Sequence, residues 1–335
     1  MTSVTTALAG DRGADTAGLI IRSFAARQAE DWDDLVRRSC NGTFLHTRRF
    51  LSYHRDRFAD RSLVLYGRRG RVAGVFPAAV SPADRETIVS HPGLTYGGLV
   101  HDGSVRGASM IVALHEIAEH YRRLGYRRLR YKAIPTIYHS EPADDDLYAL
   151  FRVGAYLYRS DLSAVVDFAH RGHVSHSRAQ RRRRAEAAGV SVEESWDEIA
   201  GFWQILEANL ARRHGAVPVH SFEEINTLHC RFPGDILLIS AKIGSTPVGG
   251  TILFSAGPVL HSQYTATSEE GRTAFAIDPI YEQAINLAAE RGYRYFDFGT
   301  STVDEGRSLN QDLYQFKVSF GAGGMAFNHY ELDLQ

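Results

Sequence analysis

The feature that most constrains the fold of this chain is an internal repeat. Two segments resemble each other: LGYRRLRY at residues 124–131 and RGYRYFDF at residues 291–298. In each, an amphipathic stretch ends and an apolar stretch begins. Gly125 and Gly292 mark the same point in the two segments, 167 residues apart. Self-similarity at a fixed offset indicates that one structural unit occurs twice.

A second pair of segments supports the repeat. The stretches at residues 62–81 and 235–255 both have the alternation of a hairpin, and they place Gly74 opposite Gly249 at an offset of 175. The difference of about eight residues between the two offsets is an ordinary change of loop length. The alternative is chance similarity, because glycine is common just after the last residue of any helix.

Chain length and periodicity predict the domain organisation. A chain of 335 residues is long enough for two domains. Each half has the pattern of a short strand, helices, a meander of strands, a long helix (108–124 or 279–291) and a return strand. We therefore predict an α/β (α+β) fold of two tandem units, each a mixed, mostly antiparallel sheet flanked by helices. The expected boundaries are a flexible tail at 1–18, a first domain at 19–160 and a second domain at 161–335.

Composition limits the class of protein. Hydrophobic residues make up 44% and charged residues 23%, which is typical of a globular chain, and the formal net charge of −1 provides no general basic surface. Cys40 and Cys230 are far apart and lack CxxC spacing, so we expect a reducing compartment. The sequence contains no signal-peptide pattern and no apolar run of about 18 residues. We expect a cytoplasmic protein without a membrane span, and its oligomeric state is unknown.

Several motifs carry a resemblance to a known family. The pattern of meander, helix and strand resembles the GNAT acyltransferases, and its doubled form resembles the Fem-type aminoacyltransferases that build peptidoglycan cross-bridges. The resemblance implies two GNAT-like domains with the chemistry in the second, and a role in natural-product or cell-envelope biosynthesis. Relatives tend to carry an acid where Val303 stands and a Gly near Asp312, so the acceptor is expected to differ. The motifs are TYGG (95–98), YKAIPTIYH (131–139), DLYALFRVGAYLYRSDLSAVVD (146–167), PVHSFEEI (218–225), HSQYTATSEEGR (261–272), FDFGTST (296–302) and LNQDLYQFKVSFGA (309–322).

Lys317 is the first catalytic candidate. Acyl transfer to an amine passes through a tetrahedral oxyanion, which a fixed cation stabilises. In Fem-type enzymes a Phe-Lys pair near the C-terminus serves the acyl carbonyl, and Phe316-Lys317 resembles that pair, which makes Phe316 a substrate-binding candidate. The chain has three lysines against 35 arginines, so a lysine here departs from its own usage. The alternative is a solvated lysine beside an aromatic ring.

The FDFGTST segment follows the form of a strand that ends in a hydroxyl-bearing loop. Asp297 alternates with two phenylalanines, and Ser301 and Thr302 follow it. In GNAT proteins the fourth and fifth strands splay apart to admit the acyl donor, and residues 259–267 and 294–298 resemble that pair. We expect Asp297 to be a catalytic, orienting acid and the two hydroxyls to bind substrate. The alternative for Asp297 is a structural cap on the next turn.

The HSQYTAT segment predicts a polar strand face. Strict alternation places His261, Gln263 and Thr265 on one face and Tyr264 on the other. Polar side chains are costly to bury unless they bind something, so His261, Gln263 and Tyr264 are substrate-binding candidates. The alternative is a satisfied polar network between sheet and helix.

Other histidines are weaker candidates. His220 stands before a predicted helix and could accept a proton from the amine nucleophile, although a loop histidine often has no such role. Tyr138 and His139 are substrate-binding candidates in the first half. No P-loop, HExxH, GxSxG or GxGxxG motif occurs, and the scattered histidines lack the support that a metal site needs, so no metal is predicted.

The acyl donor is left open between two carriers. The turn at 268–278, which would hold the pyrophosphate of coenzyme A, contains two adjacent glutamates and a capping aspartate, and only Arg272 offsets them. Aminoacyl-tRNA is the other donor of doubled GNAT proteins, and a basic helix could contact its phosphates, although most such runs are solvated helix faces. The donor-binding candidates are Arg181, Arg182, Arg183, Arg184 and Arg272.

Together these features predict an amide-forming acyltransferase that acts on an amine of a small-molecule, amino-sugar or peptide-like acceptor. Aminoacyl-tRNA is the expected co-substrate, no cofactor is expected to stay bound, and tRNA is the expected macromolecular partner. The alternatives are an acyl-CoA-dependent N-acyltransferase and a non-catalytic GNAT-like binding module.

Overall fold

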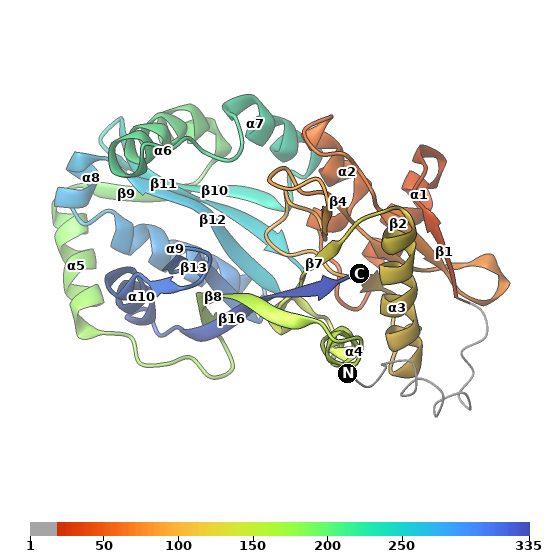
Figure 1. Cartoon of the computed structure of the whole chain (residues 1–335). Coiled ribbons are helices and arrows are strands. Elements are labelled where there is room, and N and C mark those ends of the chain that lie inside the picture. Colours follow the sequence, from red (N-terminus) through yellow and green to blue (C-terminus); the bar gives the residue numbers. More distant parts are fainter. Residues whose placement is uncertain (1–18) are drawn as a thin grey trace. The chain divides into compact units, whose positions relative to one another are not determined.

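The computed structural model describes residues 19–335, and the predicted tail at 1–18 lies outside the described residues (Figure 1). The chain divides into two compact units, and the first boundary between them falls between Ser160 and Asp161. Unit 1 takes the chain up to Ser160 together with 327–335, and unit 2 takes 161–326. The sequence-based boundary placed 327–335 in the second domain, whereas these residues pair with a strand of unit 1.

Among the described residues, unit 1 contains two groups of strands and four α-helices, of which α3 is the longest. One sheet has the order β1-β2-β3-β6, and the strands β4, β5, β7 and β16 follow one another in a second. The elements are β1 (Ile20–Ser23), α1 (Ala29–Arg37), α2 (Arg48–Leu51), β2 (Leu63–Tyr66), β3 (Val72–Phe76), β4 (Ala79–Val80), β5 (Thr87–Val89), β6 (Val100–His101), α3 (Ala108–Arg123), β7 (Arg128–Lys132) and α4 (Asp145–Arg152).

The core of unit 1 forms on one stripe of α3. The helix buries Met110, Leu114, Ile117 and Tyr121, whose spacing of three and four residues places them on one face. Gly125 follows the helix with a φ of 87°, a left-handed conformation that glycine adopts without a Cβ penalty. The helix therefore ends where the sequence predicts.

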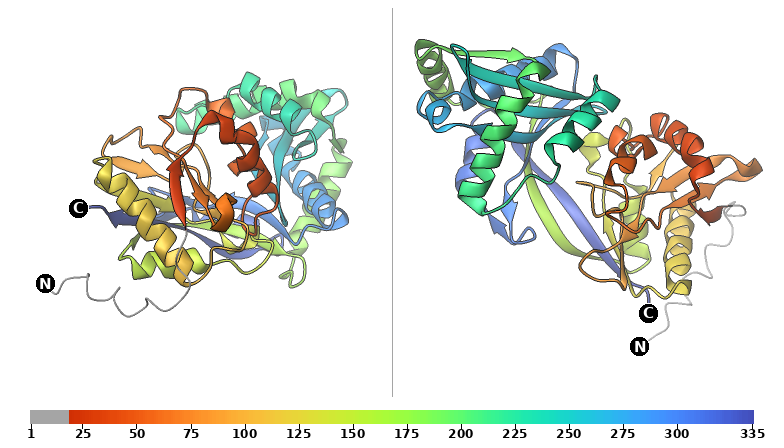
Figure 2. Two further views of the ribbon diagram at one scale, coloured as in Figure 1. Left: turned by 90° about the vertical axis from the view of Figure 1, so that its right-hand side faces the viewer. Right: turned by 90° about the horizontal axis from the view of Figure 1, so that it is seen from above.

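Unit 2 is built on a mixed sheet with the strand order β8-β13-β12-β11-β10-β9 (Figures 1 and 2). Strands β8 (Tyr156–Asp167) and β16 (Gly323–Asp333) each contribute residues to both units. The remaining elements are α5 (His176–Ala187), β9 (Val190–Glu194), α6 (Ile199–His214), α7 (Phe222–Arg231), β10 (Ile236–Ile243), β11 (Thr246–Ala256), β12 (Val259–Thr267), α8 (Glu269–Thr273), α9 (Ile277–Glu290), β13 (Tyr295–Thr300), β14 (Thr302–Val303), β15 (Ser308–Leu309) and α10 (Gln311–Val318).

Helices cover both faces of the unit 2 sheet. Figure 1 shows α6 and α7 on one side and α9 on the other. Ile280 and Ile285 of α9 join Leu260 and Phe296 of the sheet in one buried cluster. Gly292 follows α9 with a φ of 76°, which matches the position of Gly125 after α3. The predicted α/β class with a mixed sheet flanked by helices is confirmed.

Candidate functional site

The most distinctive feature of unit 2 is a fork between two neighbouring parallel strands. Strands β12 and β13 pair only over Val259–His261 and Tyr295–Asp297 within the described residues. Beyond these positions β12 continues beside β11 to Thr267, and β13 continues beside β8. The two strands therefore separate after His261 and Asp297, and we call this point the fork.

A buried carboxylate lies at the fork. His261 and Asp297 are register partners, so their side chains share one face of the sheet. The His261 Nδ1 atom lies 2.9 Å from Asp297 Oδ2, and Asp297 Oδ1 accepts hydrogen bonds from Ser163 Oγ at 2.5 Å and from Gly299 N at 2.9 Å. Asp297 is fully buried, and these donors compensate its charge.

The contact with Asp297 determines what His261 can do. A carboxylate only accepts hydrogen bonds, so Nδ1 carries the proton and Nε2 of the neutral ring presents a lone pair. Nε2 forms no hydrogen bond within the described part of the chain, and 9% of the residue is exposed. A neutral imidazole held in this way by a carboxylate can accept a proton from a reacting group.

Lys317 reaches the same fork from α10. Its Nζ donates to Gly299 O and Thr300 O, each at 2.8 Å, and only 4% of the residue is exposed. Burial lowers the pKa of Lys317 to about 8, although the negative charge of Asp297 acts in the opposite direction. Lys317 is therefore a buried group tied to the end of β13, and the alternative of a solvated lysine is wrong.

Two hydroxyl residues follow Gly299, which turns the chain with a φ of 78°. Ser301 is 2% exposed, and its hydroxyl has no hydrogen-bond partner among the described residues. Thr302 Oγ1 donates to Asp161 Oδ1 at 2.8 Å. Thr302 is therefore hydrogen-bonded to β8, whereas the Ser301 hydroxyl forms no hydrogen bond with the described residues.

The polar face predicted for β12 is wrong beyond Ser262. The pairing of β11 with β12 is irregular and inserts Gln263 as an extra residue, and such a bulge reverses the alternation that follows it. Ser262 Oγ and Thr265 Oγ1 therefore lie 2.9 Å apart on one face, and Thr251 Oγ1 contacts them at 2.9 and 2.8 Å. Tyr281 of α9 donates to Thr265 at 3.2 Å. Thr265 belongs to this hydroxyl network and does not share a face with His261.

Tyr264 points toward α6 and holds His220. The Tyr264 hydroxyl lies 2.7 Å from His220 Nδ1, and burial raises the pKa of Tyr264 to about 12, so the phenol stays protonated and can donate to the ring. His220 also lies beside Phe254, with ring centroids 6.5 Å apart. Phe254 is the register partner of His261 in the pairing of β11 with β12.

Three predicted substrate-binding residues are packing residues in this structure. Phe316 lies among the rings of Tyr281 and Phe320, with centroids 6.0 and 5.3 Å away. In unit 1, Tyr138 is 1% exposed and packs 4.3 Å from Tyr96. His139 Nε2 lies 3.1 Å from a backbone carbonyl oxygen, and burial lowers the pKa of this histidine.

Some arginines of the basic helix α5 form ion pairs with acidic residues of α9. Arg178 donates to Asp278 of α9 at 2.7 Å, and Arg182 donates to Glu282 of α9 at 2.5 Å. The guanidinium groups of Arg181 and Arg184 lie near the ring of Phe275, at 6.0 and 5.7 Å from its centroid. The fourth predicted donor-binding residue of the helix, Arg183, is exposed. Only part of the predicted cationic surface is therefore directed toward solvent.

The turn that precedes α9 is filled by groups of the protein. Helix α8 occupies it, and a Cβ added to Gly271 would lie 2.1 Å from the carbonyl oxygen of Val248. The Ala276 N–H donates to Gly271 O, and the buried Asp278 stands in the first turn of α9. Arg272 pairs with Glu269 and is not available as an isolated cation. An anion would find few free donors here.

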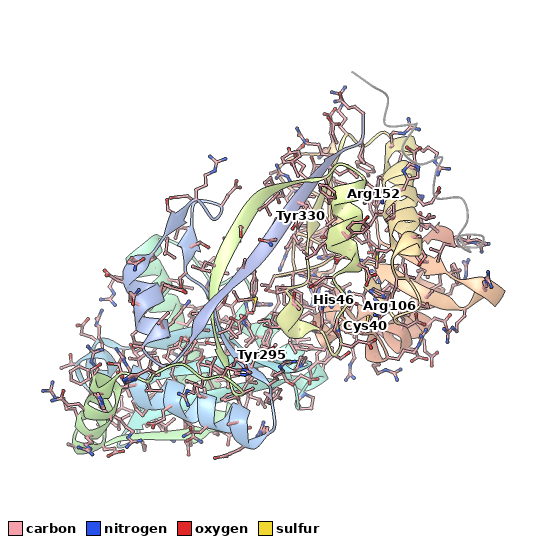
Figure 3. The ribbon with its side chains drawn as sticks, turned by 90° about the horizontal axis from the view of Figure 1, so that it is seen from below. Cys40, His46, Arg106, Arg152, Tyr295 and Tyr330 are labelled. Carbon is pink, nitrogen blue, oxygen red and sulfur yellow. The ribbon has the colours of Figure 1, made fainter. Side chains whose placement is uncertain are left out.

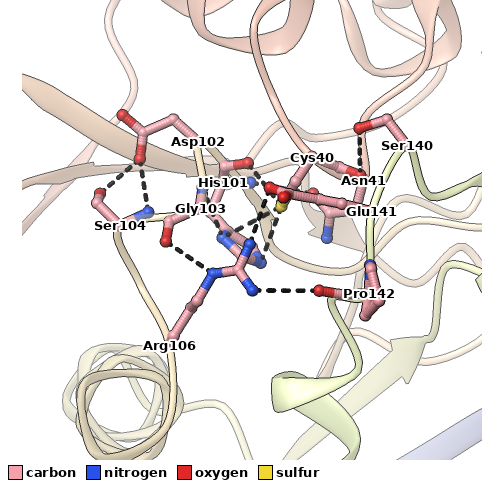
Figure 4. A network of polar contacts seen from close by, with 10 residues as sticks. All are labelled: Cys40, Asn41, His101, Asp102, Gly103, Ser104, Arg106, Ser140, Glu141 and Pro142. Carbon is pink, nitrogen blue, oxygen red and sulfur yellow. Dashed lines mark hydrogen bonds and ion pairs between the residues drawn. The ribbon is translucent and has the colours of Figure 1, made fainter.

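A second polar network lies around Cys40 in unit 1 (Figures 3 and 4). Cys40 Sγ lies 3.6 Å from both ring nitrogens of His101. Burial raises the pKa of the thiol to about 11 and lowers the pKa of His101 to about 4. Both groups are neutral near pH 7, so the thiol is not activated as a nucleophile. Arg106 and Glu141 close the network with a 2.8 Å ion pair.

Within residues 19–335, no group of three or more His, Cys, Asp or Glu side chains is placed to hold a metal ion. In the same part of the chain, no helix combines the length and the apolar character required to cross a membrane.

Comparisons with known proteins bear on the class of unit 2. Residues 174–314 match the family model described as acetyltransferase (GNAT) domain. No curated protein sequence matches the chain significantly. Unit 2 therefore contains an acyltransferase domain of the GNAT type.

Solved structures extend the likeness to both units. FemX is 13% identical, with 94% of this chain and 97% of that chain covered and a TM-score of 0.66. The C-terminal domain of a putative lysylphosphatidylglycerol synthetase from Agrobacterium fabrum is 13% identical, with 92% of each chain covered and a TM-score of 0.60. A tandem GNAT protein from the clavulanic acid biosynthesis pathway is 15% identical, with 95% and 99% covered and a TM-score of 0.52. Residues 174–314 therefore form a GNAT-type domain, and the chain as a whole has the fold of doubled GNAT proteins and of FemX.

Proposed function

We propose that this protein is an amide-forming acyltransferase that moves an acyl or aminoacyl group to an amine. The acceptor is a small molecule, an amino sugar or a peptide-like compound, and unit 2 is the catalytic domain. The observation that supports this proposal most strongly is the convergence of His261, Asp297 and Lys317 on the fork between β12 and β13. We place the reaction in the cytoplasm and in natural-product or cell-envelope biosynthesis.

In this proposal His261 is the general base. Its Nε2 removes a proton from the acceptor amine as the nitrogen lone pair attacks the carbonyl carbon of the donor. Asp297 accepts the Nδ1–H hydrogen bond and stabilises the imidazolium that forms. His261 then returns the proton to the leaving oxygen as the bond between the carbonyl carbon and that oxygen breaks. The products are an amide and the free carrier.

Lys317 stabilises the tetrahedral intermediate. An ammonium has three donors, and two of them are used by Gly299 O and Thr300 O. The third remains for the oxyanion, and these two carbonyls hold it in a fixed place. A preorganised donor in a buried site contributes on the order of 2.7–4 kcal/mol to transition-state stabilisation. Ser301 lies directly after these carbonyls and provides a further hydroxyl for the substrate.

We propose aminoacyl-tRNA as the donor. The turn before α9 supports this choice, because most of its backbone N–H groups already donate within the protein and Arg272 pairs with Glu269, which leaves few donors for a pyrophosphate. The exposed Arg183 and Arg184 can contact the phosphates of a longer carrier. Acyl-CoA is the alternative donor. It is supported by the likeness to a tandem GNAT protein whose structure is described as solved without AcCoA. In that case the bond that breaks joins the carbonyl carbon to sulfur.

The experiment is mass spectrometry of products from charged tRNAs, acyl-CoAs and candidate amines, with and without ribonuclease. We expect an amide that carries an aminoacyl group and disappears after ribonuclease treatment. His261→Gln removes the base and abolishes this product, whereas His170→Gln, at a highly exposed histidine of unit 2, leaves it unchanged. A non-catalytic module would bind ligand without forming any amide in either protein.

A further inference from the structure

We propose that Ser163 is a positioning residue for this reaction, because its hydroxyl fixes the Asp297 carboxylate and thereby keeps His261 in one tautomer and one orientation. The inference rests on the proposed function of His261. It extends that function to a strand, β8, that contributes no group in contact with the substrate.

The contacts of Asp297 come from three different parts of the chain. Oδ1 receives Ser163 Oγ from β8 at 2.5 Å and the N–H of Gly299 from the end of β13 at 2.9 Å. Oδ2 faces His261 Nδ1 on β12 at 2.9 Å. Rotation of the carboxylate would break these hydrogen bonds together, so its orientation is fixed in the folded protein. Ser163 itself is fully buried and cannot exchange this bond for one with bulk water.

A strand irregularity brings Ser163 to Asp297. Asp297 pairs with Val165, and regular pairing would place Gly299 opposite Ser163. Instead Thr300 pairs with Ser163, so β13 contains one residue more than β8 over this stretch. Gly299, with a φ of 78°, permits the bulge and turns its N–H toward the carboxylate. The bulge at Gly299 therefore places both donors, Ser163 Oγ and Gly299 N, next to Asp297 Oδ1.

The Ser163 hydroxyl also affects the negative charge on the Asp297 oxygen that faces His261. A hydrogen bond to an ionised carboxylate disperses its negative charge. Without Ser163, more negative charge remains on Oδ2, and the hydrogen bond from His261 Nδ1 becomes the main restraint on the carboxylate. Lys317 on α10 is a further charged group near the fork, and His220 lies beside the Phe254 ring.

The test compares Ser163→Ala with the unmodified protein by ¹⁵N NMR of the His261 ring, without any substrate, and by kinetics where turnover is available. We expect one Nδ1–H tautomer in the unmodified protein and a mixture in the variant. We also expect kcat to fall about 10- to 100-fold at nearly constant acceptor KM. Ser163→Thr, which keeps the hydroxyl, should restore both the single tautomer and kcat.

Ser240→Ala is the matched control, because Ser240 is 1% exposed in β10 of the same sheet and its hydroxyl has no hydrogen-bond partner among the described residues. It should leave the tautomer and kcat unchanged. If Ser163→Ala does not fold, Ser163→Cys, which keeps the size but donates weakly, is measured in the same way. An unchanged single Nδ1–H tautomer in Ser163→Ala, or in Ser163→Cys where the alanine variant does not fold, overturns the positioning role. This NMR result does not depend on turnover, so it is separate from a failure of the proposed function.

Discussion

Replacement of Lys317 by methionine probes both the stability and the chemistry of the fork. Lys317 is buried, its pKa is lowered to about 8 from an ordinary 10.5, and burial is the first cause. A shift of about 2.5 units corresponds to roughly 3 kcal/mol between the charged and neutral forms. Below pH 8 Lys317 is charged in the folded protein, so this desolvation cost lowers the free energy of unfolding. Between pH 8 and 10.5 the unfolded chain binds more protons than the folded chain, so stability rises with pH.

The expected result is therefore a difference between two pH profiles. From pH 8 to 10.5, the free energy of unfolding should rise by about 3 kcal/mol more in the unmodified protein than in Lys317→Met. Urea unfolding followed by circular dichroism at several pH values measures this difference. The chain has only two other lysines, Lys132 and Lys242, and both proteins share them. Parallel profiles would refute the assignment of Lys317 as a buried, desolvated ammonium.

The same variant tests the chemical role of Lys317. Loss of one oxyanion donor lowers kcat by about 10²- to 10³-fold, mainly without a change in acceptor KM, because the contact acts in the transition state. In the unmodified protein kcat should fall as the pH rises through about 8, where the ammonium loses its proton. A folded Lys317→Met protein with near-normal kcat would remove Lys317 from the mechanism.

Three further predictions concern the region around α9. Replacement of Arg183 and Arg184 by glutamine should raise the apparent tRNA donor constant and reduce its salt dependence, which a salt titration measures; equal slopes would argue against phosphate contacts. Arg178→Met leaves the buried carboxylate of Asp278 without its cation and should lower the free energy of unfolding by about 3–5 kcal/mol in urea titrations, whereas a loss below about 1 kcal/mol would contradict a buried pair. Gly271→Ala should destabilise unit 2 by about 1–3 kcal/mol in thermal melts, because its Cβ would meet a backbone carbonyl, and unchanged stability would show that the turn has room.

Local periodicity was sufficient to predict many elements of the fold. The strand expected at 259–267 coincides with β12, and the helices expected at 108–124 and 279–291 coincide with α3 and α9 within two residues. These elements are specified by the spacing of apolar residues and by the glycine that follows each helix. That the two units superpose, with Gly125 on Gly292, stays a prediction.

Long-range pairing was not visible in the sequence. Ser163 binds Asp297 across 134 residues, and the only local signal was a single serine in an otherwise apolar stretch of β8. The bulge at Gln263 depends on the register with β11, which alternation within one strand cannot reveal. The two acids that neutralise Arg178 and Arg182 lie 100 residues further along the chain. A basic run therefore indicated more available charge than the folded helix presents.

Amide formation at the fork is tested most directly by product analysis with the His261→Gln protein. Purified protein is supplied with charged tRNAs, acyl-CoAs and a panel of amines, and the products are identified by mass spectrometry. We expect an aminoacyl amide from the unmodified protein, its loss in His261→Gln and its loss after ribonuclease treatment. An amide formed equally well by His261→Gln would contradict the role of the fork, and one that survives ribonuclease would contradict the tRNA donor.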